Sequence, residues 1–276
     1  MCRWLTYCGD PIYLDRMIFE AKNSLIHQSL HARLSHVTTN GDGFGVGWYA
    51  ERNTPGTYRD TLPAWNDANL RSIAHQIRSG LFFAHVRAST GTATSRSNCH
   101  PFSHGKWLFM HNGQIGGYER VRRKIEALVD DRYYAHRLGT TDSELIFYLM
   151  FTEGLETDPL GALRRTIGRI VAIMRENDIG EPLRFTSVFS DGHHIYAVRF
   201  ATDDKPPSLY WRETGKECLV VSEPLDDDQG EWQEVPPGQV LVTERRGELE
   251  ILPFAAETGV QRARARLRNG RLRSIR

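Results

Sequence analysis

The fold class is decided by a stretch in the second half of the chain, Arg184-Phe185-Thr186-Ser187-Val188-Phe189, then Ser190-Asp191-Gly192-His193, then Ile195-Tyr196-Ala197-Val198-Arg199-Phe200. Two short runs rich in β-branched and aromatic residues flank an Asp-Gly turn. This pattern is typical of a β-hairpin, because the turn residues tolerate the backbone angles that a tight reversal needs. The stretch therefore predicts two antiparallel strands.

Working outward from this hairpin, the same texture of short strands and turn signals continues on both sides. Toward the C-terminus it predicts strands over Ser208–Trp211, Cys218–Ser222, Gln239–Thr243 and Leu249–Leu252, with a second hairpin turn at Arg245-Arg246-Gly247. Toward the N-terminus it predicts strands at Leu81–Arg87 and Lys106–His111, a glycine-rich turn and strand over 40–49, and a strand that begins almost at the first residue.

Helical spacing of apolar residues separates these strand-rich regions. Helices are predicted over Leu14–Leu34, Asn66–Arg78, Tyr118–Val129, Leu145–Phe151 and Pro159–Met174. Strands, helices and strands again do not make the regular βαβ alternation of a doubly wound sheet. The sequence therefore predicts an α+β domain over residues 2–255, with two antiparallel sheets packed face to face and helices outside. Residues 256–276 are expected to form a basic, flexible tail.

Composition and charge narrow the class of protein. The chain has 276 residues, 40% hydrophobic and 25% charged, which is ordinary for a globular protein. No stretch approaches the roughly 20 apolar residues of a membrane-spanning helix. Four cysteines without a C-x-x-C pair favour the reducing cytoplasm. The net charge of +1 divides into −6 for residues 1–260 and +7 for residues 261–276, and a basic tail is compatible with nucleic acid or anionic lipid as well as with a loose terminus.

Cys2 is the first candidate for chemistry. If Met1 is removed, this residue carries both a thiol and a free α-amine. A thiol is mostly protonated at neutral pH, and an α-amine with a pKa of about 7.7–8.0 can accept its proton. One residue would then supply both nucleophile and base. The alternative is a buried structural cysteine in a first strand.

Three further segments carry polar groups suited to an amino acid substrate. Arg87 ends an apolar strand and is followed by small hydroxyl residues, an arrangement suited to binding a carboxylate. Asn112-Gly113 offers two adjacent donors just after a strand, as an oxyanion hole requires. Asp142, at a helix start, could bind an ammonium group. Taken singly, an edge ion pair, a hairpin turn and a helix-start charge would explain them.

The eleven histidines invite a metal hypothesis, in particular His100, His104 and His111. Their spacing matches no standard zinc pattern, and a site needs three or four converging ligands. His27 and His31, four apart on a predicted helix, also lack a third ligand. His85 and His111 lie on apolar strands and are expected in the core or behind the site. No metal and no cofactor is expected.

At these residues the sequence resembles the class II glutamine amidotransferases, which are N-terminal-nucleophile (Ntn) hydrolases. The resemblance covers Met-Cys-Arg-Trp-Leu at the start, Asn-Gly-Asp-Gly-Phe-Gly-Val-Gly-Trp-Tyr at 40–49, and His-Pro-Phe at 100–102 before His-Asn-Gly-Gln-Ile at 111–115. It extends from Cys2 to about Pro253 and is closest to the stand-alone YafJ-like branch. That branch is related to the ergothioneine-pathway and Dug glutathione-degrading amidotransferases.

The resemblance implies a fold, a reaction and a role for each matched residue. The fold would be a four-layer αββα sandwich. The reaction would be attack on a γ-glutamyl amide, release of ammonia or an amine, and hydrolysis of a γ-glutamyl thioester. Cys2 would be the nucleophile, and Asn112 and Gly113 the oxyanion pair. Arg87 would bind the substrate α-carboxylate with Thr90 beside it, and Asp142 the α-amine.

One departure from the family bears on the substrate. Biosynthetic members usually have Arg-Trp-Ala-Thr where this chain has Arg87-Ala88-Ser89-Thr90, so a smaller wall could admit a γ-glutamyl compound larger than glutamine. The synthase domain of biosynthetic members has no counterpart here, which leaves open a separate synthase or peptidase subunit, or simple hydrolysis. A homo-oligomer also stays open, and neither nucleic acid nor membrane is an expected partner. The alternative function is a catalytically idle subunit that senses glutamine or docks a partner.

Overall fold

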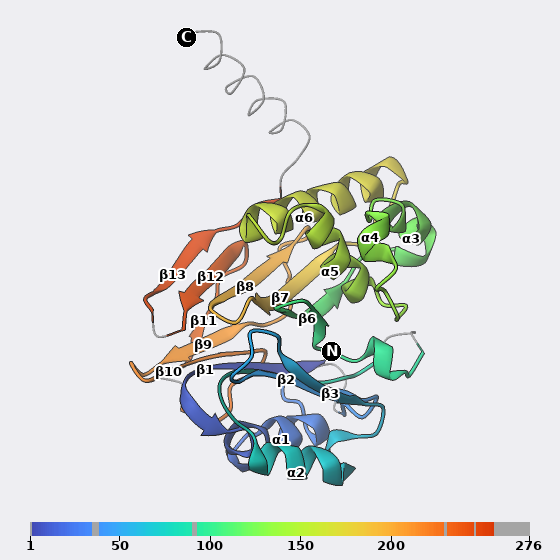
Figure 1. The fold of residues 1–276 in the computed structure, drawn as a ribbon. Helices are drawn as coiled ribbons and strands as arrows, with labels where there is room; N and C mark the ends of the chain where they lie inside the picture. The colour runs from blue at the N-terminus through green and yellow to red at the C-terminus, as the bar shows by residue number, and fades with distance from the viewer. Residues whose placement is uncertain (1, 35–38, 90–92, 229–230, 246, 257–276) are drawn as a thin grey trace.

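The computed structural model describes residues 2–34, 39–89, 93–228, 231–245 and 247–256, and shows two β-sheets stacked face to face with helices on both outer sides (Figure 1). The predicted α+β class and the four-layer αββα sandwich are confirmed. No helix within these residues is long and apolar enough to cross a membrane. The basic tail predicted from residue 256 lies, from 257 onward, outside the described residues.

The first sheet has seven strands, each antiparallel to its neighbours, in the order β11-β9-β10-β1-β4-β2-β3. In that order the strands span Gln233–Glu234, Tyr210–Glu213, Glu217–Val221, Arg3–Tyr13, Arg78–Val86, Phe44–Tyr49 and Gly56–Asp60. The first strand of the chain, β1, thus lies in the middle of its sheet. Its central position ties down the beginning of the chain.

The second sheet has six antiparallel strands in the order β13-β12-β8-β7-β6-β5. These strands span Leu249–Pro253, Gln239–Glu244, His194–Ala201, Arg184–Ser190, Trp107–Gln114 and Phe102–His104. The hairpin predicted at Ser190–His193 joins β7 and β8. Strands β12 and β13 are also antiparallel neighbours, and Arg246, in the turn predicted between them, lies outside the described residues.

Helices α1 (Leu25–Leu30) and α2 (Ala68–Gln76) cover the outer face of the first sheet (Figure 1). The outer face of the second sheet is covered by α3 (Tyr118–Glu126), α5 (Asp142–Thr152) and α6 (Pro159–Glu176). The short α4 (Asp131–Tyr134) lies beside them. The predicted continuous helix over Leu14–Leu34 is wrong. The chain forms a π-helical turn at Arg16–Glu20 and breaks before α1, where the Ser24 hydroxyl caps α1 by accepting the His27 N–H at 3.2 Å.

Three separate apolar clusters fill the three interfaces between the four layers. On β1, Leu5 and Tyr7 face the helices, while Trp4 and Cys8 face the other sheet. Successive side chains of a strand point to opposite faces, so this alternation identifies the inner face of each strand. Cys2 is two residues from Trp4, and His85 is two residues from Phe83, so both are expected on the same inner faces, at one end of the space between the sheets.

Candidate active site

Cys2 lies just before β1, beside the residues that follow β4. The antiparallel register pairs Arg3 with Val86, so the chain on either side of this pair runs together. The Cys2 Sγ accepts the N–H of Ala88 at 3.4 Å and lies 3.5 Å from the Ala88 carbonyl oxygen. Burial raises the pKa of the Cys2 thiol above its ordinary value, while the Ala88 N–H and the Arg87 charge oppose that rise. The thiol is therefore protonated near neutral pH in this structure, and a nucleophilic role needs a nearby base.

Arg87 is buried and is held by neutral oxygens of its own neighbourhood. Its guanidinium donates to the Asp42 carbonyl at 3.2 Å, to the Ser89 hydroxyl at 3.3 Å and to the Ala93 carbonyl at 3.4 Å. Its backbone N–H donates to the Gly43 carbonyl at 2.8 Å. These three acceptors are neutral, and they hold the guanidinium on the side of the chain where Cys2 contacts Ala88.

Asn112 reaches from the second sheet to the first. Its Nδ2 donates to the Cys2 carbonyl oxygen at 2.9 Å, and its buried Oδ1 has no partner within the described residues. The next residue, Gly113, has φ of +140°, and a side chain there would collide with the Arg184 carbonyl on β7. The backbone after Asn112 therefore takes a path that only glycine can follow.

Asp142 opens α5 and faces the end of β6. Thr141 caps the helix by accepting the Glu144 N–H at 3.2 Å, which fixes where the helix begins. The Asp142 carboxylate accepts the N–H of Ile115, two residues after Gly113, at 2.9 Å, and the Ser143 N–H at 2.8 Å. The acidic side chain thus lies at the same end of the sandwich as Asn112.

The structure therefore brings together five of the six predicted site residues, which are Cys2, Arg87, Asn112, Gly113 and Asp142. Their segments are separated by tens of residues in the chain and meet where β1 begins and where β4 and β6 end. The sixth, Thr90, lies outside the described residues.

Sequence reasoning missed Asp42, which supports the Arg87 segment. The Asp42 carboxylate accepts the Ser89 N–H at 2.7 Å, and its own N–H donates to the Arg87 carbonyl at 3.0 Å. The available signal was an aspartate between two glycines in the turn before β2, since aspartate in such turns often binds nearby backbone N–H groups. Asn98 was missed as well; it joins the Arg87 segment to the start of α5.

Two histidine rings lie behind Arg87, between the sheets. His85 and His100 are buried and stacked, with ring centroids 4.4 Å apart, and their four ring nitrogens have no partner within the described residues. Burial, followed by the positive charges of Arg87 and His111, lowers the pKa of His85 to about 3. His111, also buried, shares a hydrogen bond of 2.8 Å with the Ser143 hydroxyl. In the described part of the chain, no group of three or more His, Cys, Asp or Glu side chains is arranged to hold a metal ion.

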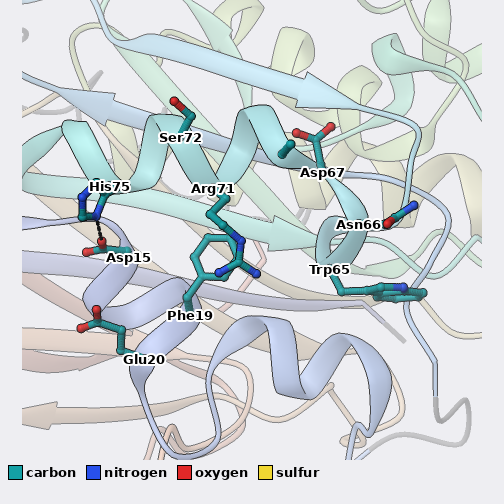
Figure 2. Close-up of a pocket in the computed structure, with 10 residues that line it drawn as sticks. Asp15, Phe19, Glu20, Trp65, Asn66, Asp67, Arg71, Ser72 and His75 are labelled. Carbon is teal, nitrogen blue, oxygen red and sulfur yellow. Dashed lines mark hydrogen bonds and ion pairs between the residues drawn. The ribbon is translucent and has the colours of Figure 1, made fainter.

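A pocket of about 620 Å³ lies elsewhere, on the helical layer outside the first sheet (Figure 2). Phe19, Trp65, Arg71 and His75 are among its lining residues, and His75 contacts Asp15 at 3.0 Å. None of the predicted site residues lines it. Its volume is therefore separate from the cluster around Cys2.

Comparison with known proteins identifies the family. The family model of the class II glutamine amidotransferases matches residues 16–205. The probable glutamine amidotransferase DUG3 of Saccharomyces cerevisiae is 32% identical over 89% of this chain and 82% of the yeast protein. The gamma-glutamyl-hercynylcysteine sulfoxide hydrolase of Mycolicibacterium smegmatis is 29% identical over 92% of this chain and all of the bacterial protein.

Solved structures agree with this result. A glutamine aminotransferase class-II domain protein from Silicibacter pomeroyi has 39% sequence identity and a TM-score of 0.75, and the match covers 93% of this chain and all of that chain. The glutamine phosphoribosylpyrophosphate amidotransferase of Bacillus subtilis, at 15% identity and a TM-score of 0.65 over 93% of this chain and half of that one, shares the fold. The chain is an amidohydrolase-type enzyme and belongs to the class II glutamine amidotransferases.

Proposed function

We propose that this protein hydrolyses a γ-glutamyl amide, with Cys2 as the nucleophile after removal of Met1. The observation that carries the proposal is the pair of contacts made by Cys2. Its sulfur lies against Ala88, next to Arg87, and its carbonyl oxygen accepts the Asn112 amide. The Cys2 thiol, the Arg87 segment and the Asn112 amide therefore lie next to one another.

Each remaining group has a role in this proposal that follows from its chemistry. The Arg87 guanidinium binds the α-carboxylate of the glutamyl group, with Thr90 beside it, and Asp142 binds the α-ammonium. The second N–H of the Asn112 amide and the backbone N–H of Gly113 stabilise the oxyanion. Because the pKa of the Cys2 thiol is raised, the thiol needs a base to remove its proton. Removal of Met1 frees an α-amine on Cys2 itself, and this amine is the base.

The reaction then runs in two balanced halves. The thiol proton passes to the α-amine as the sulfur attacks the γ-carbonyl carbon, and the resulting oxyanion collapses to a thioester while the C–N bond breaks. The leaving amine takes the proton from the α-ammonium. In the second half a water molecule loses a proton to the α-amine as it attacks the thioester. The C–S bond then breaks, which releases glutamate, and the thiolate takes the proton back from the α-ammonium, so the thiol and the free amine are both restored.

The wall beside the nucleophile favours a substrate with a leaving group larger than ammonia. Ala88 contacts the Cys2 sulfur through its backbone and presents only a methyl group where the biosynthetic enzymes carry an indole. The gamma-glutamyl-hercynylcysteine sulfoxide hydrolase, one of the similar proteins, has a bulky γ-glutamyl substrate in its name. We therefore propose a γ-glutamyl compound with an organic amine as leaving group, and water as the acceptor.

A reducing cytoplasm is the proposed location. The sequence has four cysteines and no C-x-x-C pair, a pattern that favours a compartment in which thiols stay reduced.

The test is intact mass spectrometry of the purified full chain before and after incubation with 6-diazo-5-oxo-L-norleucine, a diazoketone that mimics glutamine. We expect the loss of one methionine on expression and a single adduct, which peptide mapping assigns to Cys2. The Cys2→Ser variant, processed in the same way, should take up no reagent. An active preparation that retains Met1, or an adduct on another cysteine, would contradict the proposal.

A further inference from the structure

Asn98 connects two segments of the site that are far apart in the sequence, namely the segment after Arg87 and the turn before α5. It is 1% exposed, and it lies in a 3₁₀ turn (Arg96–Asn98) between the Arg87 segment and β5. Its Nδ2 donates to the Ala93 carbonyl at 2.8 Å, and its Oδ1 accepts the N–H of Thr140 at 2.8 Å. One small amide group therefore joins both sides.

Each of these two bonds leads directly to one charged site residue. The Ala93 carbonyl that accepts from Asn98 also accepts from the Arg87 guanidinium at 3.4 Å. Thr140 lies two residues before Asp142, in the turn that begins α5. The Asn98 side chain thus joins the Ala93 carbonyl, which binds Arg87, to the turn that places Asp142.

The turn before α5 is itself packed on both sides, so the bridge is rigid. A side chain added at Gly139 would meet Asn98 Oδ1, the Ser97 carbonyl and the Glu144 carboxylate, all within 2.8 Å. Glu144 in turn accepts the Leu138 N–H at 3.0 Å and the Gly139 N–H at 2.7 Å. A displacement of the turn would break several of these bonds at once.

We propose that Asn98 is a positioning residue that sets the separation between Arg87 and Asp142, and so makes the site selective for substrates that carry both α-charges. This inference rests on the proposed function, in which Arg87 binds the α-carboxylate and Asp142 the α-ammonium. Both charges sit on one α-carbon of the substrate, so their separation is fixed. A site that already holds Arg87 and Asp142 at this separation can bind both α-charges without the entropy cost of ordering the two side chains when the substrate binds.

The test compares three chromogenic substrates that differ only in their α-groups. L-γ-Glutamyl-p-nitroanilide carries both charges, glutaryl-p-nitroanilide lacks the α-amine, and 4-aminobutyryl-p-nitroanilide lacks the α-carboxylate. In the Asn98→Ala variant we expect kcat/KM for the complete substrate to fall by about 10- to 30-fold. For the two truncated substrates, which need only one partner, it should fall by no more than about 3-fold, because a relaxed separation then matters little.

A matched control is Asn177→Ala. Asn177 also donates its Nδ2 to a backbone carbonyl, that of Ile173 at 2.7 Å, but at the far end of α6. This variant should change none of the three values selectively. If Asn98→Ala does not fold, Asn98→Asp serves in its place, since its carboxylate still accepts the Thr140 N–H but cannot donate to Ala93.

The inference is overturned if the ratio of kcat/KM between the complete and the truncated substrates is the same in Asn98→Ala as in the wild type. An equal loss on all three substrates would give this result, because a merely structural residue would act in that way, and so would no loss at all. Failure of the proposed function gives a different result, namely a Cys2→Ser variant that turns over the complete substrate as fast as the wild type.

Discussion

Two regions of the space between the sheets differ in chemistry although the same strands build them. In the interior, the inner faces of β1, β4 and β6 carry apolar or weakly polar side chains, namely Trp4, Cys8, Leu81, Phe83, Leu108 and Met110. At the end of the sandwich, the same faces carry polar side chains, namely Cys2, His85 and Asn112. Only two residues along each strand separate the two regions.

The comparison shows how one scaffold divides stability from chemistry. Interior residues make close apolar contacts, so removing them leaves a cavity and costs free energy of unfolding. Some polar atoms at the end, such as Asn112 Oδ1 and the ring nitrogens of His85, have no hydrogen-bond partner in the part of the chain that the structure describes. Buried polar atoms of this kind cost stability, and active sites often carry such costs.

The largest expected effect comes from Cys2, just before β1, and Cys8, six residues further along on the same face of β1. Cys2→Ser should lower turnover of a γ-glutamyl amide by about 10⁴-fold or more, because it removes the nucleophile, with little change in the free energy of unfolding. Cys8→Ser should leave turnover nearly unchanged and cost about 1–3 kcal/mol, because it buries a hydroxyl in the apolar interior. Steady-state kinetics and urea denaturation measure the two quantities. The division fails if both variants lose activity and stability alike.

A smaller and similarly paired effect is expected on β6. Asn112→Ala should lower kcat by roughly 10²- to 10³-fold through loss of an oxyanion donor. Met110→Ala, two residues earlier on the same face, should cost about 2–5 kcal/mol of unfolding free energy and leave kcat within a few-fold. The same kinetic and denaturation assays apply. A kcat loss in Met110→Ala as large as that in Asn112→Ala would show that the two regions are not separable.

The smallest expected effect is on the pH dependence of stability. The pKa of His85 is lowered to about 3 in the folded protein, against about 6.5 when unfolded. Between these values the unfolded chain binds a proton that the folded protein does not, so the free energy of unfolding falls as pH falls. One such histidine contributes a slope of about 1.4 kcal/mol per pH unit.

Replacing His85 by phenylalanine should remove that share of the slope. Urea denaturation at pH 6 and pH 5 measures it, and the pKa of His100, lowered by burial, leaves a residual slope in the variant. His193→Gln, in the exposed β7–β8 turn, is the matched control and should leave the slope unchanged. If His85→Phe retains the full wild-type slope, His85 is charged in the folded protein or is not responsible for the acid sensitivity.

Local pattern was enough to predict most of the elements. Apart from the two-residue strand β11, which was not predicted, the strands from Arg184 to Pro253 were predicted within about two residues of their observed ends, because alternation and turn residues are local signals. The helix over Leu14–Leu34 was wrong because the break at 21–24 depends on distant partners. The Asn23 amide donates to Glu223 and to Pro224, about 200 residues away, and no local pattern shows such a contact.

The sequence by itself determined the residue types that the chemistry needs and the segments that carry them, since Cys2, Arg87 and Asp142 each lie at an end of a recognisable element. Asn112 and Gly113 were expected just after a strand and instead lie in the last residues of β6. Only the tertiary structure decided that these segments meet, because strand register and sheet stacking are long-range properties. It also revealed Asp42 and Asn98, whose importance comes from the backbone groups they bind rather than from any motif. A side chain that holds two distant segments together can be recognised only once both are in place.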